Sequence, residues 1–221
     1  MTDTFIIEKA IEEVETKTFG VTEQLLEIHQ VAYADNTPII ARIDREKDDG
    51  TAIVYFPIKD EKFYLAVYLD SHPQVSVRFV GTEPNNCVYF RAFSDKFSFD
   101  ELSKMTQLKP TGGRNKGDKK RPTGGTGVLW KESTIFYEPN PEPDEFEDKL
   151  KKLLDYLETD KDGVAMLVDR AEGHIQVAIE FHNGNTMLGG LHINKESLKR
   201  ITDLNLEINF DFYAGGKFFK D

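Results

Sequence analysis

The most prominent candidate for chemistry is a glycine-rich, basic stretch, KPTGGRNKGDKKRPTGGTG, at residues 109–127. Gly112 and Gly117 have the spacing of a phosphate-binding P-loop, which requires Lys and then Ser or Thr directly after the second glycine. Asp118 and Lys119 occupy those two positions instead. A carboxylate in place of the lysine would repel a phosphate, so the pattern argues against a nucleotide site, and we expect no cofactor.

The same stretch concentrates positive charge in an acidic chain. The formal net charge is −11, and six cations stand against one carboxylate between residues 109 and 121, so the rest of the chain carries −16. The cations are Lys109, Arg114, Lys116, Lys119, Lys120 and Arg121. We interpret them, together with the single tryptophan Trp130, as candidate contacts for a partner or an anion. The stretch could equally be a mobile connection, and Trp130 on the following strand a core anchor.

Nucleic-acid binding through these cations is a further alternative. It is opposed by the acidic remainder of the chain, and by the absence of aromatic residues among the cations to stack on bases.

A second pattern resembles a calcium-binding loop. Residues 158–169, ETDKDGVAMLVD, follow the spacing D-x-[DN]-x-[DN]-G-x5-E with both ends exchanged, since a Glu begins the loop and an Asp ends it. The acidic positions are Glu158, Asp160, Asp162 and Asp169. The competing interpretation is a junction between two helices at which Asp160 or Asp162 caps the second helix. We expect no metal site.

The remaining reactive residue types form no recognisable set. None of the five histidines has metal-ligand spacing, and His174 and His182 alternate with apolar residues, so we expect both to face solvent. The one cysteine, Cys87, shares its strand parity with Tyr89 and Phe93 and is expected to be a buried small hydrophobe. No nucleophile motif is present, so we expect no catalytic residues and no enzyme activity.

Composition points to a globular chain. Of the 221 residues, 39% are hydrophobic and 30% are charged, and no apolar run is long enough to span a membrane. The N-terminal sequence MTDTFIIEKAIEEVE has neither a basic nor an apolar signal region. A single cysteine excludes an internal disulfide, so we expect a cytoplasmic protein.

Periodicity predicts a first domain at residues 1–84. Apolar residues recur at helical spacing from Ile6 to Val14, and residues 21–33 are ambiguous between helix and strand. Strand patterns follow at 38–46, 51–58, 62–70 and 74–80. We expect a helix covering an antiparallel meander, with GTEPNN at 81–86 as the domain boundary.

Residues 85–221 predict a second domain, an α+β sandwich with a mostly antiparallel sheet. Ser98 with Glu101, and Asp144 with Glu147, have the spacing of capping boxes, and Asn194 can cap a third helix. Strands are expected at 87–94, around 127–137, at 174–182 before an Asn-Gly hairpin turn, and at 204–213.

Four features of this half carry a resemblance to a known family. They are the opening VYFRAFSDKFSFDELSKMTQLKPT, a Lys-Gly-Asp at 116–118 shortly before Trp130, the helix FEDKLKKLLDYLE, and the ending LHINKESLKRITDLNLEINFDFY. Over residues 87–213 the chain resembles the bacterial domain of unknown function 4279 family. The resemblance implies a small intracellular protein, and some members of the family stand beside contact-dependent toxins as candidate immunity proteins. The first 80 residues lie outside it.

These observations lead us to expect a non-enzymatic protein-interaction module, such as an immunity-type inhibitor of a basic toxin or effector, whose acidic surface would attract that partner. One alternative is a binder of small anionic ligands, or an enzyme acting on them, with its site at the domain junction and the basic stretch as a lid. The other is nucleic-acid binding. The sequence leaves the oligomeric state open.

Overall fold

The computed structural model describes residues 3–47, 49–120, 128–185 and 189–219. The helices are α1 (Asp3–Thr16), α2 (Gly20–Ile28), α3 (Phe99–Ser103), α4 (Phe146–Leu157), the short 3-10 helix η1 (Glu158–Asp160), α5 (Lys161–Arg170) and α6 (Lys195–Asp203). The strands are β1 (Tyr33–Ala34), β2 (Thr37–Pro38), β3 (Arg42–Asp44), β4 (Thr51–Pro57), β5 (Phe63–Asp70), β6 (Ser76–Ser94), β7 (Gly112–Arg114), β8 (Ser133–Tyr137), β9 (Glu172–His182) and β10 (Ile208–Gly215).

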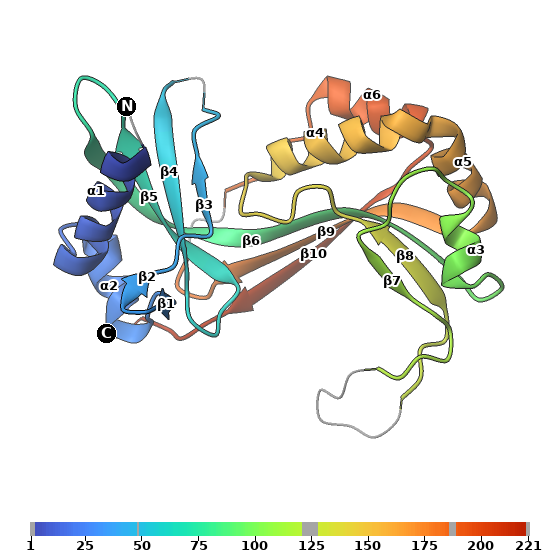
Figure 1. Cartoon of the computed structure of the whole chain (residues 1–221), viewed down its shortest axis with the longest axis horizontal. Coiled ribbons are helices and arrows are strands. Elements are labelled where there is room, and N and C mark those ends of the chain that lie inside the picture. The colour runs from blue at the N-terminus through green and yellow to red at the C-terminus, as the bar shows by residue number, and fades with distance from the viewer. Residues whose placement is uncertain (1–2, 48, 121–127, 186–188, 220–221) are drawn as a thin grey trace.

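One sheet runs through the molecule in the order β10-β9-β6-β5-β4-β3, with β8 also paired to β6 and β7 paired to β8 (Figure 1). Its neighbours are antiparallel except β9 and β10, which are parallel. The predicted α+β class with a mostly antiparallel sheet is therefore confirmed. The Asn-Gly hairpin expected after β9 is wrong, because the chain crosses over through α6 before β10 returns beside β9.

Strand β6 is shared by both halves of the sheet. Residues 76–84 pair with β5, residues 85–93 pair with β9, and residues 90–94 also pair with β8. At a rise of about 3.3 Å per residue, a strand of this length reaches about 60 Å. Residues 81–86, expected as the domain boundary, lie inside this continuous strand, so no irregular segment separates the two halves there. The division into two domains stays a prediction.

The hydrophobic residues nevertheless form separate clusters in the two halves. α1 packs against β4 and β5 in one cluster, and α4 and α5 pack against β6 and β9 in the other. The buried apolar residues of α1 are Ile6, Ala10 and Val14, and those of α4 are Phe146, Leu150, Leu153, Leu154 and Leu157. These are the predicted helical stripes, and each fully buried leucine contributes about 2 kcal/mol.

Local capping explains where several helices begin. Ser98 and Glu101 form the predicted capping box of α3, and the Asn194 side chain accepts a hydrogen bond from Ser197 N–H at 2.8 Å. The capping box predicted at Asp144 is wrong. α4 begins at Phe146 with Glu145 as its N-cap, and the Asp144 carboxylate is engaged instead in a contact between the two halves of the chain.

That contact is a buried ion pair. Arg42 Nη1, from β3, lies 2.6 Å from Asp144 Oδ2, and Lys152 Nζ donates to the same oxygen at 3.0 Å. Asn86 Nδ2, from β6, donates to the backbone carbonyl of Asp144 at 2.9 Å. The Asp144 side chain is 0% exposed. Burial pushes the pKa of Asp144 upward, but the hydrogen bonds from Arg42 and Lys152 outweigh it and hold that pKa below its ordinary value.

A pair of buried histidines makes a second contact between the halves. His29 follows α2 and His182 ends β9, and their Nε2 atoms lie 3.2 Å apart. Lys217 N–H donates to His29 Nε2 at 3.2 Å, and Gly184 N–H donates to His182 Nδ1 at 3.1 Å. His182 is 2% exposed, so the expectation that it faces solvent is wrong.

Burial and hydrogen bonding both favour the neutral form of these two histidines. Because Gly184 N–H occupies Nδ1 of His182, the proton of that ring belongs on Nε2, which faces His29 and the Lys217 carbonyl at 3.0 Å. Burial lowers the pKa of His182, and the neighbouring His29 lowers it further. Burial also lowers the pKa of His29, although Glu61, 3.7 Å from its Nδ1, opposes this.

We predict that Asp144→Asn lowers the free energy of unfolding by about 1.5–3 kcal/mol, because it removes the nearest carboxylate from the Arg42 guanidinium and leaves only Asp44 and Glu46, at 3.4 Å and 3.3 Å. Urea unfolding measures this loss. The control is Asp148→Asn, which removes a partly exposed partner of Lys47 and should cost less than about 1 kcal/mol. Equal losses in the two variants would contradict a buried ion pair at the junction.

We predict that stability decreases as the pH falls below about 6.5, the ordinary value for histidine. The unfolded chain would bind protons at His29 and His182 that the folded chain excludes, so the stabilisation is present above this pH and is lost on acidification. Urea midpoints measured across this pH range test the prediction. His182→Gln should flatten the dependence, whereas His192→Gln, at an exposed position, should leave it as in the wild type. An unchanged slope in the His182 variant would refute it.

Candidate binding face

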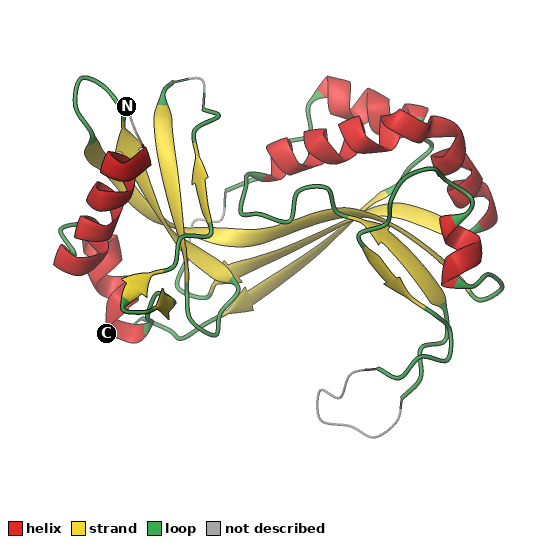
Figure 2. Ribbon diagram, viewed as in Figure 1, coloured by secondary structure: helices red, strands yellow, loops and turns green. Residues whose placement is uncertain are grey.

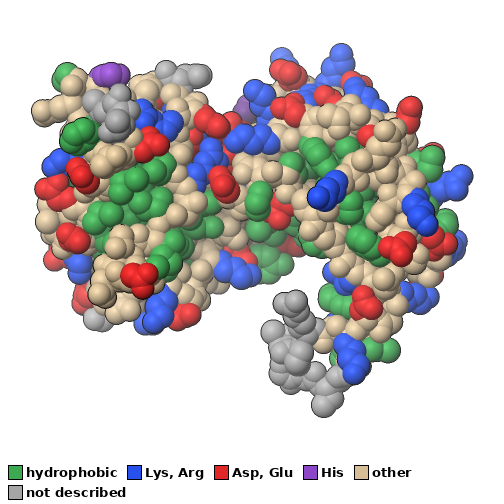
Figure 3. Space-filling model, viewed as in Figure 1, with side chains coloured by type: hydrophobic (Ala, Val, Ile, Leu, Met, Phe, Trp, Pro, Cys, Tyr) green, Lys and Arg blue, Asp and Glu red, His purple; other side chains and the backbone are tan. Residues whose placement is uncertain are grey.

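One face of the C-terminal part of the sheet is left open. α4, α5 and α6 lie over the opposite face, and no described helix covers this one (Figure 2). The molecular surface is hollowed beneath it, between the N-terminal half and the strands β7 and β8 (Figure 3). Side chains alternate along a strand, so this face carries the residues between the core positions. We call it the open face: Tyr89, Arg91 and Phe93 of β6, Arg114 of β7, Thr134 and Phe136 of β8, and His174 of β9.

The basic stretch forms one arm of a β-hairpin beside this face. Gly117 N–H donates to the Trp130 carbonyl at 2.8 Å, and Trp130 N–H donates to the Asp118 carbonyl at 2.9 Å. Lys120 N–H donates to the Val128 carbonyl at 2.9 Å. Residues 112–114 and 117–120 are therefore paired with the opposite arm, with a turn between them. Arg121 and the rest of the predicted stretch, to residue 127, lie outside the described residues.

The Lys-Gly-Asp sequence makes a turn in this hairpin. The Asp118 carboxylate accepts a hydrogen bond from Asn115 N–H at 2.7 Å. Gly117 has φ +89°, a backbone conformation that residues other than glycine rarely adopt. Lys116 N–H donates to Ser133 Oγ at 3.0 Å, which joins the turn to β8. Asp118, which rules out a P-loop, thus has a structural role.

Trp130 is not the core anchor that its position suggested. It is half-buried on the surface, with the Arg114 guanidinium carbon 3.4 Å and the Lys120 ammonium 4.4 Å from its ring centroid. Such cation–π contacts contribute about 0.5–1 kcal/mol each at exposed sites. Two of the predicted cations therefore lie against the predicted tryptophan.

Arg91 occupies a similar aromatic setting on β6. Its guanidinium carbon lies 4.6 Å from the ring centroid of Phe93. In the sheet register Arg91 stands opposite Phe136 on one side and His174 on the other. The ring of Phe136 lies over Gly112, where an added Cβ would be only 2.4 Å from the ring. A glycine at 112 therefore makes room for this aromatic side chain.

The open face carries polar atoms without partners. Arg91 Nε, Arg114 Nε and Thr134 Oγ1 are buried and form no hydrogen bond. Neither guanidinium lies within ion-pair distance of a described carboxylate. Glu132 acts on Arg114 only from farther away. Burial, followed by the charge of Arg91, lowers the pKa of Arg114. Two guanidinium groups thus influence each other with no counterion between them, and a buried polar group without a partner costs about 1–3 kcal/mol.

The other predicted cations are not gathered here. Lys116 Nζ donates to the Asp95 carbonyl at 3.0 Å, and Lys119 is exposed on the hairpin. Lys109 lies beside α4, where its backbone exchanges hydrogen bonds with the Tyr156 hydroxyl. The structure therefore brings together Arg114, Lys120 and Trp130 of the predicted set.

The calcium-loop pattern does not form a loop. Residues 158–169 are helical, spanning η1 and most of α5. Glu158 pairs with Arg200 at 2.8 Å, and Asp160 accepts a hydrogen bond from Gly163 N–H at 3.1 Å. The interpretation of Asp160 as a helix cap is thus confirmed. Asp162 and Asp169 are exposed on α5, and the described residues contain no group of three or more His, Cys, Asp or Glu able to hold a metal ion.

Cys87 also differs from the expectation of full burial. It is half-buried, because the core side of this part of β6 is formed by Val88, Phe90 and Ala92. Burial raises the pKa of its thiol.

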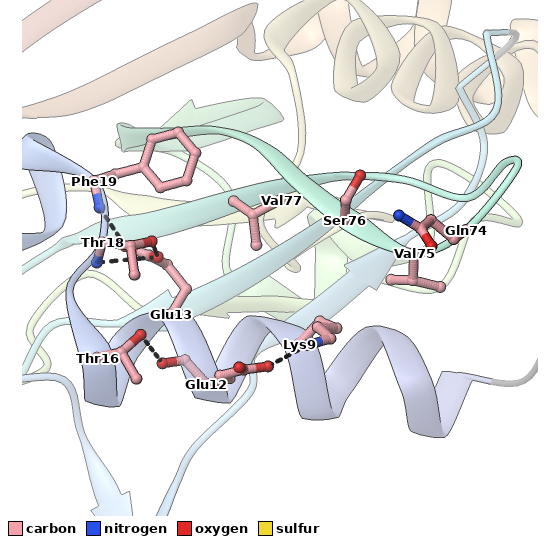
Figure 4. Close-up of a pocket in the computed structure, with 10 residues that line it drawn as sticks. All are labelled: Lys9, Glu12, Glu13, Thr16, Thr18, Phe19, Gln74, Val75, Ser76 and Val77. Atoms are coloured by element: carbon pink, nitrogen blue, oxygen red, sulfur yellow. Dashed lines mark hydrogen bonds and ion pairs between the residues drawn. The ribbon is translucent and has the colours of Figure 1, made fainter.

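A pocket of about 440 Å³ lies between α1 and the start of β6 (Figure 4). Its buried carboxylate, Glu13, accepts hydrogen bonds from Thr22 Oγ1 at 2.5 Å and from Phe19 N–H at 3.1 Å. Glu13 therefore binds the N-terminal end of α2. Lys9 and Glu12, the other charged residues of the lining, pair with each other at 2.5 Å. The charged groups of this pocket are thus already engaged.

The junction between the halves likewise has its cations paired. Arg42 and Lys152 contact Asp144, and Lys47 contacts Glu145 at 3.0 Å. The basic hairpin joins the sheet through β8, which pairs with residues 90–94 of β6. The N-terminal half pairs with residues 76–84, at the opposite end of that strand. The structure does not place it at the junction as a lid.

The chain is thus an α+β protein whose C-terminal half backs a mostly antiparallel sheet with helices and leaves an aromatic, arginine-bearing face open. The family described as Domain of unknown function (DUF4279) matches residues 83–215, and the chain belongs to this family. The match confirms the resemblance and begins within β6. No curated protein and no solved structure matches the chain. None of the helices in the described part of the chain has the length and apolar character needed to cross a membrane.

Sequence reasoning missed Arg91, Thr134 and Phe136. A signal was present in VYFRAF, where Arg91 alternates with Tyr89 and Phe93. A charged residue on the same strand face as two aromatic residues indicates that this face is not the core.

We predict that Arg114→Ala shifts the fluorescence emission of Trp130 to longer wavelength and increases its quenching by acrylamide, because one face of the indole ring becomes hydrated. The single tryptophan makes the signal specific. Lys119→Ala, an exposed change on the same hairpin, is the control and should leave the emission unchanged. Identical spectra for the Arg114 variant and the wild type would contradict the stacked arrangement.

Proposed function

We propose that the chain is a non-enzymatic binding module that holds another protein against its open face. The observation that carries this proposal is the uncompensated pair Arg91 and Arg114, set among aromatic side chains. Folded proteins leave few buried polar groups without partners, and those that remain call for an explanation such as a bound group. Arginine and aromatic residues are also the types enriched at the centres of protein interfaces.

The biological role we propose is that of an immunity-type inhibitor, which binds a toxin or effector and blocks it. The family resemblance supports this role. The net charge of −11 supports a basic partner, since long-range attraction would speed its association. An acidic group on that partner would then meet the two arginines at the contact itself.

The alternative of an anion site at the domain junction has less support, because Arg42, Lys47 and Lys152 are each already paired there. Nucleic acid is disfavoured by the charge of the whole chain, which repels a polyanion at long range.

The test is affinity capture from the native host with the full chain as bait. We compare the wild type with the double variant Arg91→Gln/Arg114→Gln and with a matched control, Lys151→Gln/Lys161→Gln. The control removes two charges from exposed positions on α4 and α5. The wild type and the control should each retain a stoichiometric protein partner after nuclease treatment, and the arginine variant should lose about nine-tenths of it, as expected for removing charged hydrogen bonds.

Recovery of no stoichiometric partner at low or moderate salt would overturn the proposal. Equal capture by all three proteins would also overturn it, by placing the contact elsewhere.

A further inference from the structure

We propose that the open face binds a carboxylate of its partner, presented by an acidic side chain with aromatic neighbours, and that this carboxylate lies between Arg91 and Arg114. The inference rests on the proposed function and names the chemistry that the partner brings.

Stacking holds the two guanidinium groups in place without ion pairs. Arg91 lies on Phe93, and Arg114 lies on Trp130, at 4.6 Å and 3.4 Å from the ring centroids. In a typical folded protein a carboxylate of the same chain would fix such groups. Here the rings do so, and the outer N–H groups of both arginines bond to no described residue. They are positioned as donors before a ligand arrives.

The two arginines are also close enough to disfavour each other. The charge of Arg91 contributes to lowering the pKa of Arg114. Arg114 pairs in register with Thr134, and Thr134 pairs with Phe93, the residue on which Arg91 stacks. The unpartnered Thr134 hydroxyl thus lies in the row that connects the two groups. An anion between the arginines would relieve their repulsion.

A carboxylate fits this geometry. The planar guanidinium fork matches the two oxygens of a carboxylate, and such charge-assisted hydrogen bonds are about twice as strong as neutral ones. Phosphates share the same donor chemistry. They carry more charge, however, and the remainder of the chain, at −16 outside residues 109–121, repels a polyanion more than it repels a single carboxylate.

Aromatic surface flanks the arginines. Tyr89 and Phe136 have ring centroids 6.0 Å apart, and Phe93 and His174 are also 6.0 Å apart. These edge-to-face pairs have partly exposed rings. A partner segment that carries aromatic residues beside its carboxylate could pack on them, whereas a wholly hydrophilic acidic segment could not.

Fluorescence of Trp130 provides the test, because the ring is stacked on Arg114 and is the only tryptophan. The full chain is titrated with the peptide acetyl-Phe-Glu-Phe-amide, which carries one carboxylate between two aromatic residues, with its counterpart containing Gln in place of Glu, with inorganic phosphate, and with an oligothymidylate. We expect a saturable change with the Glu peptide alone. Arg91→Gln should weaken binding of the Glu peptide about tenfold, and so should Arg114→Gln. Because Arg114→Gln changes the Trp130 spectrum itself, the affinity of this variant is measured by its competition with the wild type for the peptide. Lys119→Gln should bind as the wild type does.

Circular dichroism establishes that each variant is folded, and Arg91→Gln, which leaves the Trp130 stack intact, gives the direct reading. Equal binding of the Gln peptide would overturn the inference, since the rings alone would then be the site. Tighter binding of phosphate or of the oligothymidylate would overturn it in favour of those ligands. If the Glu peptide caused no change in Trp130 fluorescence, the inference would also fail.

The two proposals can fail separately. If the Glu peptide binds but the host yields no protein partner, the carboxylate site stands and the proposed function fails. If capture depends on Arg91 and Arg114 but the peptide does not bind, the function stands and the carboxylate assignment fails.

Discussion

The rest of the structure depends on the continuity of strand β6. Backbone pairing along residues 76–84 holds the N-terminal meander, and pairing along residues 85–94 holds β8 and β9. Because one strand serves both, the two hydrophobic clusters are joined by a ladder of backbone hydrogen bonds. Arg42 with Asp144, and His29 with His182, then add side-chain contacts between elements far apart in the sequence.

The cations at the junction have carboxylate partners, whereas those on the open face do not. At the junction Arg42, Lys47 and Lys152 each meet a carboxylate, so their desolvation is offset inside the chain. On the open face, Arg91 and Arg114 are supported by rings and meet no carboxylate. Since unpaired charge is costly when half-buried, this difference separates a contact that maintains the fold from a surface suited to a partner.

Much of the local structure was predictable from the sequence because it depends on near neighbours. The stripes of α1 and α4, the capping box of α3 and the Asn194 cap follow from residues three or four positions apart. The errors occurred where a distant partner decided the outcome. Asp144 has the type and position of a helix cap, yet Arg42, about a hundred residues earlier, engages it. His182 has the parity of an exposed residue, yet His29 and Lys217 cover it.

The candidate site shows the same division. The sequence by itself determined the apolar stripes of α1 and α4, the caps of α3 and α6, the concentration of cations at residues 109–121, and, through Asp118, the absence of a P-loop motif in that stretch. Only the tertiary structure decided that Arg114 stacks on Trp130, that Arg91 of a different strand joins the same face, and that no described helix covers it. The physical reason is that helical and strand periodicity act over a few residues, whereas sheet register and the burial of charge depend on segments brought together only when the chain folds.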